Sequence, residues 1–157
     1  MTMTIGAPGP TVALLTGLLG FEVVGEAEGA IRLAVNGDEP GKRIELVYGG
    51  GRQPARNGLG TVHHVAMAIA SSDQQVQLRQ ELLDLGYAVT EVLDRQYFQS
   101  IYFREPGGVL FEVATVGPGF TVDETLPELG RELKLPTWEE PNRAAIEKGL
   151  PVVSRIS

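Results

Sequence analysis

Hydrophobic and polar positions follow the same succession of patterns in both halves of the chain. In the first half, MTMTI (1–5) alternates as a strand does, and Val12, Leu15 and Leu19 follow at helical spacing. Three later runs, FEVVGE, AIRLAV and RIELVYG, are typical of strands, and the turns between them contain glycines and an Asn-Gly pair. The first half therefore predicts one strand, one helix and three strands.

The second half repeats this order. VHHVAMAI (62–69) predicts a strand, and Ser72 is expected to cap a helix whose apolar face includes Leu78 and Leu82. Gly86 is expected to end that helix. The runs YAVTEVL, QSIYFRE and VLFEVATV predict three more strands, with EPGG as the turn between the last two.

Aligning the halves places LLTGLLGF on LRQELLDLGY and RIELVYG on LFEVATV, which indicates an internal repeat. Two unrelated stretches with the same order of elements are the alternative. We predict an α+β fold in which two βαβββ modules in tandem form a curved mixed sheet with an open cleft. We expect a single two-module domain over 1–157: a first module at 1–50, a glycine-rich linker at 51–60, a second module at 61–116, and a C-terminal extension at 117–157 that packs back on the modules.

Composition and charge narrow the functional classes. The 157 residues are enough for one domain with its own core, and the net charge of −7 would repel a phosphate backbone, so we expect no nucleic-acid binding. Because the chain has no cysteine, any metal must be held by nitrogen and oxygen ligands. We expect no membrane span, since no apolar run approaches the roughly 18 residues required, and a cytoplasmic location.

The two histidines of the chain, His63 and His64, are adjacent, and they open a predicted strand. Side chains alternate along a strand, so only one of the two faces a given concave surface. On the last predicted strand, Glu112 lies among apolar neighbours, where an unpaired carboxylate is costly. His64 and Glu112 are thus candidate ligands for a divalent cation. Alternatively, His64 is a hydrogen-bonded residue at a strand end, and Glu112 forms an ion pair with Arg95 or Arg104.

The second half resembles a known superfamily. HHVAMAI, the helix that follows and SIYFREPGGVLFEVAT are similar to a module of the vicinal oxygen chelate superfamily, which includes glyoxalase I, bleomycin-resistance proteins and extradiol dioxygenases. The features that carry the resemblance are His64, the turn 105–108 and Glu112. A narrower resemblance, over about residues 11–151, is to the C-terminal half of hydroquinone-type ring-cleaving dioxygenases, through DRQYF, SIYFREPGG, PGFTVDE and LPTWEE.

This resemblance implies a metal-dependent enzyme. Fe(II) is the expected metal, with Mn(II), Ni(II) or Zn(II) as alternatives, and His64 and Glu112 match two of its ligands. His63 matches a neighbour of the ligands. Tyr102 matches a tyrosine that hydrogen-bonds a substrate hydroxyl, and Arg95 an arginine that stabilises a phenolate. Read without the resemblance, Tyr102 is an ordinary strand aromatic and Arg95 an exposed hairpin charge. The implied substrates are a hydroquinone or catechol and dioxygen.

One departure concerns the third ligand. The family enzymes are about twice this length, and their remaining histidine ligand lies in the N-terminal half. Three hypotheses follow: a partner completes the site; Glu45, which aligns with Glu112, completes it; or the scaffold has lost its metal and binds a small aromatic molecule. Glu45 is alternatively a solvated charge beside Lys42 and Arg43. We expect a homodimer, since module edges need partners, although a second copy offers no third histidine position.

Two other functions compete with the dioxygenase. One is a small-molecule binding protein of the bleomycin-resistance kind, which does no chemistry. The other is a glyoxalase-like lyase or isomerase that uses Ni(II), Zn(II) or Mn(II).

Overall fold

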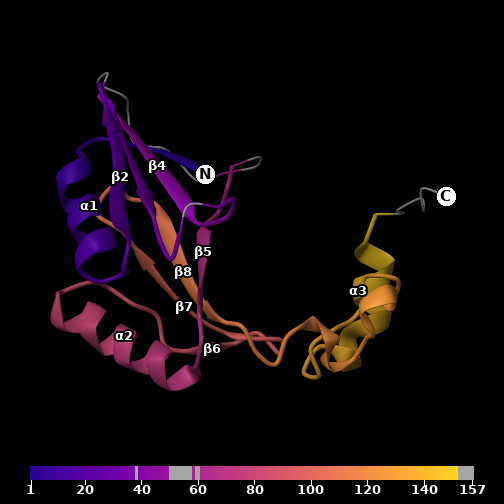
Figure 1. The fold of residues 1–157 in the computed structure, drawn as a ribbon. Helices are drawn as coiled ribbons and strands as arrows, with labels where there is room; N and C mark the ends of the chain where they lie inside the picture. Colours follow the sequence, from indigo (N-terminus) through magenta and orange to yellow (C-terminus); the bar gives the residue numbers. More distant parts are fainter. Residues whose placement is uncertain (38, 50–57, 59–60, 152–157) are drawn as a thin grey trace.

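The computed structural model describes residues 1–37, 39–49, 58 and 61–151. The order predicted for the first half, a strand, a helix and three strands, is confirmed (Figure 1). Its elements are β1 (Thr2–Ile5), α1 (Pro8–Gly17), β2 (Glu22–Ala27), β3 (Ala30–Ala34) and β4 (Arg43–Tyr48). The predicted linker 51–60 lies outside the described residues apart from Gly58.

The second half has the same order of elements. They are β5 (Val65–Ile69), α2 (Ser72–Asp84), β6 (Leu93–Asp94), β7 (Gln99–Arg104) and β8 (Leu110–Thr115). The segment after β8 contains short helices: η1 (Phe120–Val122), η2 (Leu126–Glu128), η3 (Glu140–Asn142) and α3 (Arg143–Gly149). None of the helices in the described part of the chain is long and apolar enough to cross a membrane.

Each module folds into one four-stranded mixed sheet, and the two sheets have the same topology. The strand orders are β1-β4-β3-β2 and β5-β8-β7-β6. In both sheets the first strand runs parallel to the last, and the other neighbours are antiparallel. The register also repeats. Thr2 and Arg32 flank Glu45 as Ala66 and Tyr102 flank Glu112. The internal repeat inferred from the sequence therefore corresponds to a repeat in structure.

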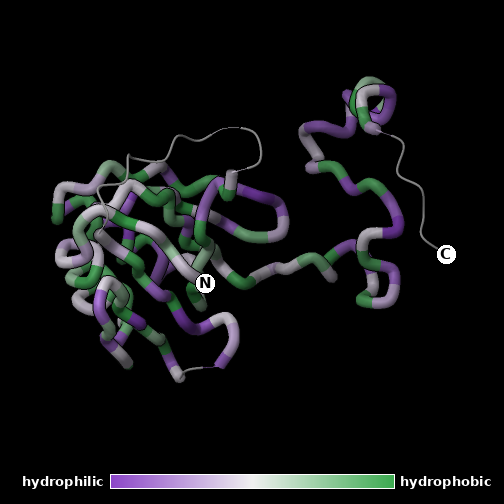
Figure 2. The backbone as a smooth tube through the Cα atoms, turned by 90° about the horizontal axis from the view of Figure 1, so that it is seen from above, coloured by the Kyte–Doolittle hydropathy of each residue, from purple (hydrophilic) through white to green (hydrophobic). Residues whose placement is uncertain are grey.

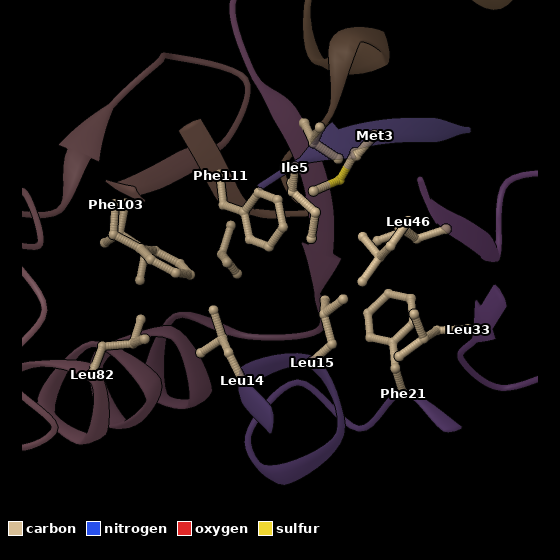
Figure 3. Packing of buried hydrophobic residues seen from close by; sticks show 14 residues of the cluster. Met3, Ile5, Leu14, Leu15, Phe21, Leu33, Leu46, Leu82, Phe103 and Phe111 are labelled. Atoms are coloured by element: carbon tan, nitrogen blue, oxygen red, sulfur yellow. The ribbon is translucent and has the colours of Figure 1, made fainter. Parts of the chain in front are cut away.

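A shared hydrophobic core joins the two modules. Leu14 and Leu15 of α1 lie between Leu82 of α2 on one side and Phe21 on the other, with Phe111 of the second sheet above them (Figure 3). The same cluster contains further side chains from both sheets: Met3, Ile5, Leu33, Ile44, Leu46, Val65, Ile101, Phe103 and Val113. Both modules therefore contribute to one continuous core.

The strand predicted over 62–69 begins only at Val65, so His63 and His64 precede it, and two further predicted boundaries were wrong. The N-cap of α2 is Ser71 rather than Ser72, because the Ser71 hydroxyl accepts a hydrogen bond from the backbone N–H of Gln74 at 3.2 Å. The run 87–93 does not form a full strand. Only Leu93 and Asp94 form the short strand β6, which pairs with β7. The earlier part of the run is joined to β7 by the isolated bridge between Val89 and Phe103.

The expectation that the extension after β8 packs back on the modules holds only for its first residues, where Phe120 packs on Tyr97 and Asp123 accepts a hydrogen bond from Tyr97. The two views show residues 124–151 apart from both sheets (Figures 1 and 2). The segment keeps its shape through contacts of its own: the Arg143 guanidinium donates to the carbonyl of Leu133 and to the carboxylates of Glu140 and Glu147. We call residues 117–151 the C-terminal arm.

Candidate active site

Glu112 lies at the centre of the candidate site, on β8 between β5 and β7. It is paired in register with Ala66 of β5 and with Tyr102 of β7. Residues in register on neighbouring strands point to the same face, so Glu112 shares its face with Tyr102 and, one pleat further along β7, with Ser100. The Glu112 side chain is only 5% exposed, so its carboxylate must be satisfied by neighbouring groups.

Three polar groups meet the Glu112 carboxylate. The Ser100 hydroxyl, which is fully buried, donates to Oε1 at 2.5 Å, and the Tyr102 hydroxyl donates to the same oxygen at 2.7 Å. The other oxygen, Oε2, lies 2.8 Å from Nε2 of His64. The two hydroxyls thus fix the carboxylate by one oxygen and leave the second for His64. The partners of the Glu112 carboxylate are therefore Ser100, Tyr102 and His64. They are not Arg95 or Arg104, which were the alternative considered from the sequence.

The two histidines form a hydrogen-bonded pair just before β5. Their Nδ1 atoms lie 2.9 Å apart, and the rings meet edge to face. When His64 is neutral and Nε2 carries the proton that faces Glu112, its Nδ1 is an acceptor, so His63 must donate from Nδ1. A metal at Nε2 would require the other tautomer, in which His64 donates from Nδ1 and His63 accepts. In either tautomer His63 and Glu112 hold His64, which is about one third exposed, from two sides.

Tyr102 and Arg95 complete the polar face. The Arg95 guanidinium carbon lies 5.6 Å from the centre of the Tyr102 ring, which is a cation–π distance. Burial raises the pKa of the Tyr102 hydroxyl, and the hydrogen bond to Glu112 raises it further, while the nearby Arg95 opposes the shift. The Tyr102 ring also packs edge to face on His64. Arg95 is thus an exposed charge that lies against the site, and Tyr102 is a strand aromatic with a polar role in it.

Glu45 lies elsewhere. Its carboxylate pairs with Arg32 at 3.1 Å and accepts a hydrogen bond from Thr2 at 3.2 Å, and the Arg32 hydrogen bond is the main cause that lowers its pKa. Among the described residues, no group of three or more His, Cys, Asp or Glu side chains lies close enough to hold a metal ion. The structure therefore does not assemble the set of Glu45, His64 and Glu112. In the first sheet Arg32 occupies the register position that Tyr102 holds in the second sheet, and it pairs with Glu45.

The donor set at His64 and Glu112 suits a divalent cation. Two ligands about 2.1 Å from a metal at a right angle are roughly 3 Å apart, close to the 2.8 Å between Nε2 and Oε2. A neutral imidazole and a carboxylate are two members of the set of two histidines and one carboxylate that holds iron in many oxygenases. The described residues supply two of its three donors.

Ser100 is the site residue that sequence reasoning missed. It lies two positions before Tyr102, so strand alternation places both side chains on one face. A serine two positions before Tyr102, on the strand predicted next to the one that carries Glu112, was the available signal.

Comparison with known proteins places this chain. Residues 2–113, which include both modules and the His64–Glu112 pair, match the family model of the Glyoxalase/Bleomycin resistance protein/Dioxygenase superfamily. The chain belongs to this superfamily.

Relatives within the superfamily are named as ring-cleaving enzymes. The chain is 41% identical over 152 residues to a Bacillus subtilis (strain 168) protein named "Putative ring-cleaving dioxygenase MhqO", a match that covers 95% of this chain and 47% of the relative. It is 49% identical over 81 residues to the chlorohydroquinone/hydroquinone 1,2-dioxygenase of Sphingobium indicum, covering 50% of this chain and 24% of that protein. Three curated relatives match this chain almost from end to end, and the chain spans about half of the length of each of them.

Solved structures agree with the fold. A crystal structure of a Bacillus subtilis protein described as a "putative dioxygenase" superposes with a TM-score of 0.88 at 39% identity, covering 98% of this chain and 49% of that one. The fosfomycin resistance protein FosX of Mesorhizobium loti superposes with a TM-score of 0.56 at 19% identity, covering 73% of this chain and 87% of that one, which shows the shared fold alone.

Proposed function

We propose that this chain is a metal-dependent ring-cleaving dioxygenase, or the metal-binding half of one, that acts on a hydroquinone or a catechol with dioxygen. The observation that carries the proposal is the 2.8 Å approach of His64 Nε2 to Glu112 Oε2, beside a tyrosine and an arginine, in a relative of proteins named as ring-cleaving dioxygenases. The geometry of His64 and Glu112 and the relation to proteins named as ring-cleaving dioxygenases are both needed, because many members of the superfamily share the fold.

The metal would be held by His64 Nε2 and Glu112 Oε2. Fe(II) is the first choice, since a site of histidine and carboxylate ligands with open positions is typical of oxygenases, and Mn(II), Ni(II) or Zn(II) are alternatives. When bound, the metal supplies an electron path between substrate and dioxygen. The third donor comes from beyond the described residues. We propose that the protein functions as a homodimer.

Two residues of the chain would contact the substrate, and a third would position a metal ligand. Tyr102 donates its proton to Glu112, so its oxygen remains an acceptor for a substrate hydroxyl. The Arg95 charge, next to the Tyr102 ring, stabilises the ionised phenol. His63 holds the ring of His64 through the contact between their Nδ1 atoms and so positions a ligand. In the reaction, the ring C–C bond beside a hydroxylated carbon breaks and both oxygen atoms enter the product, so no external reductant is consumed.

The test is oxygen uptake after anaerobic loading with Fe(II). With hydroquinone, we expect one dioxygen consumed per molecule, and a ring-opened product heavier by two oxygen atoms. Glu112→Gln removes the carboxylate charge and should abolish uptake, whereas Glu91→Gln, at an exposed position, should leave it unchanged.

Two other outcomes separate the alternatives. Bound metal without oxygen uptake corresponds to the metal-binding half alone. Binding of the hydroquinone by a folded protein that retains no metal contradicts the enzyme and favours a binding protein of the bleomycin-resistance kind.

A further inference from the structure

The C-terminal arm carries a series of apolar side chains that its own modules leave uncovered. Their exposed fractions lie between 37% and 75%, the highest at Leu126. The members are Phe120, Val122, Leu126, Leu133, Trp138 and Leu150. Scattered exposed apolar residues are ordinary, but a segment with this many marks an interaction surface. Figure 2 shows apolar stretches recurring along the arm where it lies apart from both sheets.

The arm is attached to the second module at its base. The Phe120 ring lies 4.9 Å from that of Tyr97, Tyr97 donates its hydroxyl to Asp123 at 2.9 Å, and the N–H of Gly119 donates to the carbonyl of Tyr97. Beyond this base, the arm is shaped by its own contacts, those of Arg143 in particular. A preformed arm loses little conformational entropy when it binds, which favours association.

The modules hold a groove that suits such an arm. It has a volume of about 890 Å³ and lies between the two modules. Its apolar lining includes Leu19, Phe21, Ile44, Val65, Met67 and Leu78. The lining also includes three charged residues: Lys42, Arg43 and Glu81. In the arm, seven acidic side chains face four basic ones over residues 117–151, an excess of negative charge that suits Lys42 and Arg43 of the groove. Lys42 also pairs with Glu39, however, and three of the arm's glutamates pair with arginines of the arm.

We propose that the arm of one copy docks in this groove of a second copy, and that the exchange is reciprocal. A two-fold arrangement uses every contact twice. Phe120 and Trp138 are each more than half exposed, so the exposed area of the two aromatic and four aliphatic side chains in each of two arms, together with the groove surface that they cover, is on the order of the 1,200 Å² at the lower end of a stable interface.

This proposal specifies the interface of the homodimer. It rests on the proposed function only in taking the homodimer as the form of the protein that carries the metal site. It is tested without metal, so that its failure is distinguished from a failure of metal binding. Light scattering coupled to gel filtration should show a dimer for the full chain. Leu126→Glu and Trp138→Ser should raise the dimer dissociation constant at least about tenfold with unchanged circular dichroism, because their side chains are exposed and not part of the fold.

Matched controls separate the arm from surface apolarity in general. Val76→Glu changes a side chain of α2 that is 56% exposed, similar to the 54% of Trp138, and should leave the dimer intact. Lys42→Glu, on the groove border, should weaken it. Trp138 is the sole tryptophan, so its fluorescence should shift to the red on dilution. A monomeric full chain overturns the proposal in favour of a different polypeptide as the arm's partner, and a dimer unaffected by the arm variants overturns it in favour of another interface.

Discussion

Thr11 of α1 and Glu105, at the end of β7, form a buried hydrogen bond that links the two modules. The Thr11 hydroxyl donates to Glu105 Oε2 at 2.6 Å, and both residues are almost completely buried. Two backbone N–H groups of the following turn, from Gly107 and Val109, donate to the same carboxylate. The EPGG turn is therefore fixed to the first module's helix through its glutamate.

Removing the Thr11 hydroxyl should destabilise the protein. Thr11→Val leaves a buried carboxylate short of one donor, which typically costs about 1–3 kcal/mol in the free energy of unfolding. Urea denaturation measures this. The control is Thr16→Val, because the exposed Thr16 hydroxyl donates only to a carbonyl of its own helix. Equal effects of the two substitutions would contradict the linking role.

A second contact between the modules requires a glycine. A Cβ at Gly107 would lie 2.6 Å from Cγ2 of Ile5 in β1, so the turn has no room for a side chain. Gly107→Ala should cost about 1–3 kcal/mol in stability, as overpacking of a core does, measured by thermal unfolding. Gly6→Ala is the matched control, since nothing lies within 4 Å of a Cβ at Gly6. A similar loss in both variants would count against the close approach.

The Ser100 hydroxyl fixes the carboxylate of Glu112, the metal ligand that we propose. Ser100→Ala should lower metal affinity about 10–100-fold, the usual effect of losing a hydrogen bond to a ligand, because Glu112 Oε1 keeps only Tyr102 as donor. Metal titration by calorimetry measures the change. Ser72→Ala, which removes an exposed hydroxyl bonded to Gln99, should have no effect. Unchanged affinity in Ser100→Ala would mean that Tyr102 alone holds the carboxylate.

The raised pKa of Tyr102 predicts a dependence on alkaline pH. Burial first and the hydrogen bond to Glu112 second favour the neutral phenol in the folded state. The stability that this contributes is fully present below the ordinary tyrosine pKa of 10.0, and it is lost as the pH rises through the raised value. Absorbance titration of tyrosinate, as wild type minus Tyr102→Phe, should give a midpoint above 10.0. A midpoint at or below it contradicts the account.

The order of strands and helices could be predicted from the sequence, because the hydrophobic periodicity of each module indicates its elements. Alternating runs and a helical stripe predicted the order of elements in both halves, and the aligned glutamates occupy the same register position in the two sheets. The path of the arm was not predictable, since its prolines and short helical patterns fix local shape and not where the segment lies.

The site was predictable in part. His64 and Glu112 were paired by strand position, and the structure brings them together with Tyr102 and Arg95. Glu45 was proposed from the same alignment, but equivalent register in two sheets does not bring two residues to one site. Its neighbour Arg32 stands where the second sheet has Tyr102, so the carboxylate is satisfied within its own sheet.

The central claim is that His64 and Glu112 bind a metal ion. The most direct test is the metal content per chain after anaerobic reconstitution with Fe(II) and desalting, measured for wild type, His64→Ala and the exposed control Glu91→Gln. We predict close to one iron per chain in wild type and control, and its loss in His64→Ala. A folded wild-type protein that retains no metal, or equal iron in His64→Ala, would contradict the account.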